Sequence, residues 1–208
     1  MKKHFGPIKV KRKTGNEPFR HRGKKQNFKL NDFWSWSTSD LVINVTRGLV
    51  AEFIVAQALN AADGVRIAWA PFDLRTPKPE RIKVEVKSAA YLQSWSQDNF
   101  SIIKFDIEKT TPLDNKKGGY RGKPRRVAKV YVFALLAEKD KSKVDPLNLD
   151  QWKFCVVPTA TLNNRKRSQQ SITLNSLKSE KEELKVQDVD FFGLKDAVKK
   201  AASIKAVS

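Results

Sequence analysis

Two acidic residues and one lysine have spacings that suit metal-assisted hydrolysis of a phosphodiester. Glu85 and Lys87 are two residues apart in a segment that alternates polar and apolar residues, so in a β-strand both would lie on one face. Asp73 lies shortly before this segment, where a hairpin would bring its carboxylate beside that of Glu85. Neighbouring carboxylates repel each other, and Mg²⁺ (or Mn²⁺), which prefers oxygen ligands, relieves that repulsion. We therefore predict a metal site that includes Asp73 and Glu85.

Lys87 and Glu52 complete this candidate site. A lysine beside a metal ion can hold or deprotonate a water molecule and can offset negative charge in a phosphoryl transition state. Glu52 lies next to the apolar stripe of a predicted helix, from which it could reach over the sheet as a third, water-mediated ligand. The alternative is a solvated polar face with ordinary salt bridges, and the sequence leaves it open.

A helix and a hairpin must position these four side chains. The helix is expected from Ser39, as its N-cap, to about Leu59. Spacings of three and four residues give it one apolar face, composed of Val42, Val45, Leu49, Phe53 and Ala56. The hairpin is expected to pair 66–74 with 81–88, and two prolines in 75–80 form its tip.

The remaining pattern predicts an α/β fold with a mixed central sheet flanked by helices. Segment 89–97 fits either a short helix or an extended loop, and Trp69 and Trp152 are expected in the core with Cys155 as a core thiol. Further strands are expected at 100–107, 127–137, 152–157 and 171–174, and helices at 159–164 and 194–206.

The charge is strongly positive. The chain of 208 residues carries 41 Lys and Arg against 22 Asp and Glu, a net charge of +19. Residues 1–29 hold eleven of these basic residues and one acid, hence +10, which suits either a solvated, disordered arm or an arm that binds the phosphate backbone of DNA. We favour DNA, and a second basic segment, the loop 109–126, would help to hold it. The predicted DNA-binding residues are Lys11, Arg12, Lys13, Arg20, Arg22, Lys24, Lys25, Lys116, Lys117, Arg121, Lys123, Arg125 and Arg126.

Several classes of protein are excluded by composition. One cysteine rules out an internal disulfide and a cysteine-based zinc site, and both histidines lie in the basic arm, which leaves a Ser-His-Asp hydrolase or a His-metal nuclease without a credible base. There is no GxxxxGK[ST] loop, no apolar secretory segment and no apolar run long enough to span a bilayer. We therefore expect a cytoplasmic protein that has no membrane partner.

The candidate residues also resemble a known superfamily. Glu52, Asp73, Glu85-Val86-Lys87 and the following SAAYLQSW are similar to the core of the PD-(D/E)XK nucleases, the restriction-endonuclease-like fold, and most of all to small bacterial members and junction resolvases. The likeness covers about half of the chain, from Gly48 to Val157, although Pro71 precedes Asp73 by two positions instead of one.

This resemblance implies an αβββαβ core and hydrolysis of DNA phosphodiesters with a divalent metal, usually Mg²⁺. It implies that Asp73 and Glu85 bind the metal, with the carbonyl of Val86 as an additional ligand. Lys87 would position the attacking water, Glu52 would assist through water, and Gln93 would be a polar helper.

We thus predict a metal-dependent DNA endonuclease that acts on duplex or branched DNA. Its expected parts are a basic, flexible arm (1–31), a nuclease-like α/β domain (32–178) and a C-terminal helical extension (179–208). A homodimer would supply the two active sites needed to cut both strands of a duplex. Two alternatives remain: a non-catalytic nucleic-acid-binding protein on the same fold, and an interaction module that partners recruit to DNA.

Overall fold

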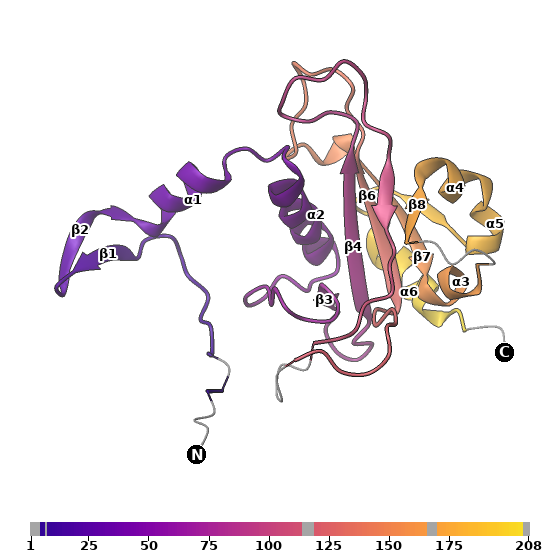
Figure 1. The fold of residues 1–208 in the computed structure, drawn as a ribbon, viewed down its shortest axis with the longest axis horizontal. Helices are drawn as coiled ribbons and strands as arrows, with labels where there is room; N and C mark the ends of the chain where they lie inside the picture. The colour runs from indigo at the N-terminus through magenta and orange to yellow at the C-terminus, as the bar shows by residue number, and fades with distance from the viewer. Residues whose placement is uncertain (1–4, 7, 114–118, 166–169, 206–208) are drawn as a thin grey trace.

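A mixed five-stranded sheet forms the centre of the fold and confirms the predicted α/β class (Figure 1). The computed structural model describes residues 5–6, 8–113, 119–165 and 170–205. The strand order is β3-β4-β6-β7-β9; β4 and β6 run parallel, and the other neighbours are antiparallel. The strands are β3 (Leu74–Arg75), β4 (Lys83–Ala90), β6 (Val130–Leu136), β7 (Trp152–Pro158) and β9 (Gln187–Val189).

Each face of this sheet has its own hydrophobic core. The helices α2 (Asn44–Ala58) and α6 (Leu194–Ser203) cover the face to which Val84, Val86 and Val132 belong. The opposite face, with Tyr131 and Phe133, packs against a smaller layer. The segments of this layer lie between the strands of the sheet in the sequence. This layer comprises β5 (Lys104–Asp106) paired with β8 (Ser171–Thr173), and the short helices α3 (Thr159–Asn164), α4 (Leu174–Ser179) and α5 (Lys181–Leu184); the 3₁₀ turn η1 (Leu149–Gln151) leads into β7.

The basic N-terminal segment contains regular structure. The strands β1 (Pro18–His21) and β2 (Lys24–Lys29) form an antiparallel two-stranded ribbon, and the helix α1 (Leu30–Thr38) follows it directly. Figure 1 shows this unit projecting from the side of the molecule that carries α2 and β3. Residues 18–29 therefore form an ordered hairpin where the sequence analysis expected a flexible arm.

Helix α2 is correctly located, but two details predicted for it are wrong. Ser39 is the C-cap of α1, and α2 begins only at Asn44 after a turn in which Asp40 accepts the N–H groups of Val42 and Ile43.

The predicted apolar face of α2 points largely to solvent. Val45 is 75% exposed and Phe53 is 54% exposed, whereas Ala51, Ile54 and Val55 pack on the sheet. The helix is apolar around most of its circumference, so spacing alone could not select the face that the sheet covers.

Two predicted strands are much shorter than expected. Of 66–74 only Leu74 pairs with β4, together with Arg75, and the preceding residues form an irregular loop in which Trp69 is 70% exposed, contrary to the core position predicted for it. Of 100–107 only β5 is a strand, and it pairs with β8 outside the central sheet. The described part of the connection from β4 to β6 contains no helix, so the αβββαβ order that the resemblance implied is not reproduced at this point. The buried Trp152 and the buried, free Cys155 agree with the prediction.

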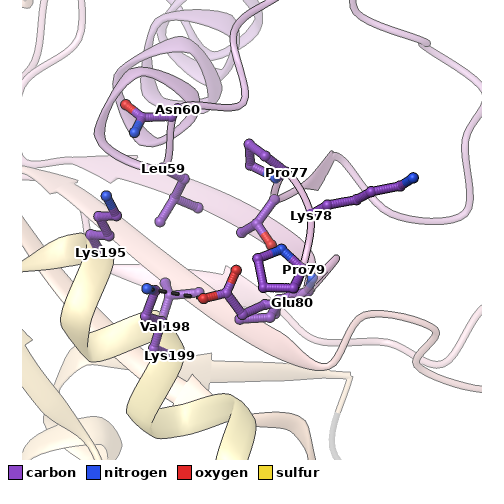
Figure 2. Close-up of a pocket in the computed structure, with 11 residues that line it drawn as sticks. Leu59, Asn60, Pro77, Lys78, Pro79, Glu80, Lys195, Val198 and Lys199 are labelled. Atoms are coloured by element: carbon purple, nitrogen blue, oxygen red, sulfur yellow. Dashed lines mark hydrogen bonds and ion pairs between the residues drawn. The ribbon is translucent and has the colours of Figure 1, made fainter.

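The C-terminal segment belongs to the core, although the sequence analysis set it apart as an extension. β9 forms the edge of the sheet, and α6 contributes Leu194, Val198 and Ala201 to the core beneath α2. Figure 2 shows Lys195, Val198 and Lys199 of α6 beside the tip of the β3–β4 hairpin, where Lys199 and Glu80 form an ion pair of 3.0 Å next to a cavity of about 250 Å³. No helix among the described ranges combines the length and the apolar character needed to cross a membrane.

Because of the orientation of α2, substitutions at the neighbouring positions 53 and 54 should differ in their effect on stability. We expect Ile54→Ala to lower the free energy of unfolding by about 2–4 kcal/mol, because it removes a buried side chain from the α2–sheet interface. Phe53→Ala should cost about 0.5 kcal/mol or less, because this ring is more than half exposed. Urea unfolding of both variants measures the difference; equal losses would contradict the orientation described above.

Candidate active site

The middle of β4 presents Glu85 and Lys87 on the face opposite α2. Val84 and Val86 are buried on the α2 side, and strand alternation therefore places Glu85 and Lys87 on the other face, as predicted. Lys87 Nζ lies 2.9 Å from a carboxylate oxygen of Glu85. Both side chains keep some access to solvent, with 28% of Lys87 and 19% of Glu85 exposed.

Asp73 lies at the edge of the sheet, where the pairing between β3 and β4 ends. Its N–H donates to the carbonyl of Val84 (3.1 Å), which continues the ladder by one step. The residues that precede Asp73 lie outside the sheet, and the carboxylate of Asp73 takes the next position along β4 by accepting the N–H of Val86 (2.8 Å). This bond fixes the carboxylate at the centre of β4. The N–H and C=O of one strand residue point to the same side, so the carbonyl of Val86 faces this edge as well.

The surroundings of Asp73 disfavour the charged form of its carboxyl group. The pKa of Asp73 is raised to about 7; burial is the largest cause, and the negative charges of Glu85 and Glu52 contribute to the same rise. The hydrogen bond from Val86 and the charge of Lys87 act in the opposite direction but do not compensate. A divalent cation between Asp73 and Glu85 would remove this imbalance.

Lys87 is held in its charged form. Burial by itself would lower its pKa, but the charge and hydrogen bond of Glu85, followed by the charges of Asp73 and Asp106, raise the pKa of Lys87 overall. In this arrangement Lys87 is therefore an ammonium group that can donate hydrogen bonds and offset negative charge; it is not positioned as a free base.

Glu52 approaches the site from α2 but is occupied by an arginine. Arg66, in the loop before Asp73, donates from Nε and Nη2 to the two carboxylate oxygens of Glu52. The hydrogen bond with Glu52 is the main cause of the raised pKa of Arg66, and the charge of Asp73 adds to it. Glu52 thus lies within electrostatic range of Asp73 but is bound to Arg66, and its role as a water-mediated ligand remains a prediction.

Three residues near the site were not predicted from the sequence. Arg66 had been assigned to a plain strand. Tyr131 is the register partner of Glu85 on β6, and burial, together with the charge of Glu85, raises its pKa. Asp106 on β5 contributes to the electrostatics of both Lys87 and Tyr131. The one available signal was the tyrosine within an otherwise apolar strand; its position opposite Glu85 depends on strand register, which the sequence does not specify.

The donor set suits an oxygen-coordinated divalent ion only in part. Asp73 uses one oxygen for Val86, and within the described residues no hydrogen bond reaches its other oxygen, Oδ1. Asp73, Glu85 and the Val86 carbonyl are hard oxygen donors of the kind that Mg²⁺ and Mn²⁺ accept together with water. Across the described ranges, however, no three Asp, Glu, His or Cys side chains are arranged as a ready metal site. The two carboxylates fit such an ion, whereas Glu52 would first have to leave Arg66.

Gln93 lies apart from the acidic cluster. It is buried after the end of β4, where its side chain accepts a hydrogen bond from Arg47 (3.3 Å) and donates one to Ser101 (3.2 Å). Arg47 is a buried arginine whose acceptors include the carbonyl of Val42 and the side chain of Asn44. Gln93 therefore joins the start of α2 to the exit of β4; its proposed role as a helper of Lys87 remains a prediction.

The predicted DNA-binding residues separate into groups. The ribbon carries Arg20, Arg22, Lys24 and Lys25. The exposed segment before it, which has no regular secondary structure, carries Lys11, Arg12 and Lys13, and Arg12 donates to the carbonyl of Ala62 (3.1 Å). Arg126 is half-buried and hydrogen bonds to the carbonyl of Ile107 and to Asn163, which gives it a structural role. Arg121, Lys123 and Arg125 are exposed in the second basic loop, and Lys116 and Lys117 lie outside the described residues.

Comparison with known families decides the class of protein. The family model of bacteriophage T4 endonuclease IV matches residues 3–176, which include the ribbon, α2 and every residue of the candidate site. The chain belongs to this family. A search of curated proteins gave no match.

Membership of the endonuclease IV family confirms that the protein is a nuclease. The match extends over residues 3–176, well beyond the acidic cluster itself. The metal, the roles of Asp73, Glu85 and Lys87, and the relationship to the PD-(D/E)XK superfamily are not contained in this match and remain predictions.

The raised pKa of Asp73 predicts a stability cost at neutral and alkaline pH. Because the pKa of Asp73 is higher in the folded than in the unfolded protein, the folded state binds more protons, and the free energy of unfolding falls as pH rises from about 4 to about 7. We expect Asp73→Asn to be more stable than the wild type by about 1–3 kcal/mol at pH 8 without metal, and this gain to shrink toward pH 4.

Urea unfolding at pH 4.5 and pH 8 in EDTA measures this difference. Asp98→Asn, at an exposed position, is the matched control and should show no such gain. A variant Asp73→Asn that is destabilised at pH 8 would contradict the electrostatic description of the site.

Proposed function

We propose that the protein is a divalent-metal-dependent DNA endonuclease of the PD-(D/E)XK type. The observation that carries the proposal is the hydrogen bond from Val86 to Asp73, which fixes one carboxylate of the pair Asp73 and Glu85 at an open sheet edge while Lys87 stays charged beside Glu85. Family membership supports the nuclease activity, and the chemistry of the donors supports the metal.

Asp73, Glu85 and the carbonyl of Val86 would hold the ion. When bound, Mg²⁺ lowers the pKa of a coordinated water and polarises a phosphoryl oxygen. Lys87 would donate hydrogen bonds to the attacking water or to the phosphate and stabilise the negative charge that develops during hydrolysis. Its ion pair with Glu85 holds the ammonium group next to the position where that charge appears.

The net charge of +19 supports a polyanionic substrate. With 41 basic and 22 acidic residues, the protein attracts a phosphate backbone at long range and releases counterions on binding. These observations leave open whether the DNA is duplex, single-stranded or branched, so the activity test has to include all three.

Lys87→Ala tests the catalytic role. We expect it to lower the rate of cleavage of a labelled DNA substrate with Mg²⁺ or Mn²⁺ by about 10²–10⁴-fold, since it removes one charge that stabilises the transition state. DNA affinity in EDTA should stay within about twofold of that of the wild type, because one of 41 basic residues is lost.

Lys153→Ala is the matched control, a lysine in strand β7 of the same sheet that is exposed and should leave cleavage unchanged. If the wild type leaves duplex, single-stranded and branched DNA intact with both metals, or if Lys87→Ala cuts as fast as Lys153→Ala, the proposed mechanism is wrong.

Arg66→Gln tests the position of Glu52. Because Arg66 binds Glu52 through both carboxylate oxygens, its removal should free this side chain and strengthen Mn²⁺ binding to the DNA-free protein by about 3–10-fold. Isothermal titration with Mn²⁺ measures the change. Arg75→Gln, an exposed arginine on β3, is the control. Weaker Mn²⁺ binding in Arg66→Gln than in this control would show that Glu52 is no ligand.

A further inference from the structure

The ribbon β1–β2 and helix α1 form an exposed unit with almost no contact to the core. All six residues of β2 are exposed, and α1 has no buried residue. Contacts within the ribbon hold it together: its strands pair antiparallel with one register shift between Pro18 and Arg20, and the ring centroids of Phe19 and Phe28 lie 4.7 Å apart. Its conformation therefore does not depend on burial against the catalytic domain, and both of its faces are open to a partner.

Within the part of the chain that the structure describes, the basic side chains of the ribbon form no ion pair. Among the described residues 5–6 and 8–38, no Lys or Arg forms an ion pair, whereas lysines and arginines of the body pair with Glu52, Glu85, Asp140 and others. The two acids of the unit are bound to backbone groups: Glu17 accepts the N–H groups of Thr14 and Gly15, and Asp32 accepts that of Lys29. Positive charge on the ribbon is thus left for an external anion.

The turn of the ribbon places an arginine where its backbone is unfavourable. Arg22 has φ 47° and Gly23 has φ 79°, the positive values that a two-residue turn of type I′ requires at both positions. Asn, Asp and Gly adopt this conformation readily, whereas a long side chain such as that of arginine does so at a cost. The guanidinium of Arg22 is thereby carried at the tip, in a segment where four of six residues, 20–25, are basic.

The location of the ribbon fits a substrate that reaches the catalytic edge. Figure 1 shows it on the side of α2 and β3, away from α3, α4 and α5. The chain that precedes it is linked by the hydrogen bond from Arg12 to Ala62, at the start of the loop that leads to Asp73. A second copy of this chain would be a poor occupant, because two molecules of charge +19 repel each other.

We propose that the β1–β2 ribbon is a separate DNA-binding element that holds the phosphate backbone of the substrate through Arg20, Arg22, Lys24 and Lys25. This inference relies on the proposed function for the identity of the polyanion. The ribbon anchors the DNA strand outside the catalytic site, and the acidic cluster cuts it; the two elements contribute binding and chemistry separately.

The test compares two triple variants of equal charge. Arg22→Asn/Lys24→Gln/Lys25→Gln removes three ribbon charges and puts at position 22 a residue that the turn accepts. Lys185→Gln/Lys195→Gln/Lys200→Gln removes three exposed charges from the C-terminal region. Fluorescence anisotropy with a labelled duplex and a labelled single strand, in EDTA and over a range of KCl concentrations, gives affinity and salt dependence without any cleavage.

The ribbon variant should bind DNA at least about tenfold more weakly at 0.1 M KCl, with the slope of log K against log salt reduced by about 2–3, because each phosphate contact contributes roughly 0.7–0.9 to that slope. The control variant should keep a slope close to that of the wild type. The comparison of the two oligonucleotides shows which form of DNA the ribbon holds. With metal present and at saturating DNA, the ribbon variant should cleave at the wild-type rate but need more DNA to reach saturation.

Equal losses in the two triple variants would mean that net charge alone sets affinity and would overturn the proposal, as would an unchanged salt slope in the ribbon variant. If the ribbon variant binds DNA as tightly as the wild type but no longer binds anionic lipid vesicles, the ligand of the ribbon is a membrane surface and the proposal is wrong. Since binding is measured without metal, failure of the nuclease mechanism leaves this result unaffected, and a failed ribbon leaves Lys87-dependent cleavage intact.

Discussion

The hydrogen bond between the N–H of Val86 and the carboxylate of Asp73 is the interaction on which the site depends. It exists because β3 is only two residues long, so the N–H of Val86 on the edge of β4 has no backbone partner from β3. A side chain fills the position that a strand would otherwise take. This holds a carboxylate in partly buried surroundings next to Glu85, and the resulting rise of the pKa of Asp73 to about 7, for which burial is the main cause, is the cost of that placement. A divalent cation bound between the two carboxylates would stabilise the charged form of Asp73 and would in turn be bound by it.

The two-layered packing of the sheet explains how the site stays rigid and yet accessible. Val84 and Val86 anchor β4 in the core under α2 and α6, while the alternate side chains, Glu85 and Lys87, emerge on the other face at the point where the sheet edge is open. The parallel partner β6, buried along its whole length, fixes the register and places Tyr131 against Glu85. A shift of β4 by one residue relative to β6 would turn valines toward the site in place of Glu85 and Lys87. The register between β4 and β6 is therefore as important for the site as the residue types are.

The features that depend on local alternation were predicted correctly from the sequence, whereas those that depend on tertiary packing were missed. Alternation in β4 correctly placed Glu85 and Lys87 on one face, and the unbroken apolar run correctly located β6. The exposed face of α2 was mistaken for its buried face, because Leu49, Phe53 and Ile54 are all apolar and only the sheet decides which of them it covers. The ion pair of Arg66 with Glu52 joins an irregular loop to a helix, and no periodicity announces such a contact. The ribbon was missed for a different reason: its pairing is local, but the abundance of basic residues suggested a flexible arm, and the Arg22-Gly23 turn was not recognised.

A crystal structure of the protein soaked with Mn²⁺ is the most direct test, since the anomalous signal of manganese identifies the ion without reference to activity. The account predicts a single strong peak bounded by the carboxylates of Asp73 and Glu85 and the carbonyl of Val86, absent from crystals of a variant that lacks the Asp73 carboxylate. A peak elsewhere, or density that shows Asp73 and Glu85 binding only water at millimolar Mn²⁺, would contradict the claim that these two acids form the metal site of the nuclease.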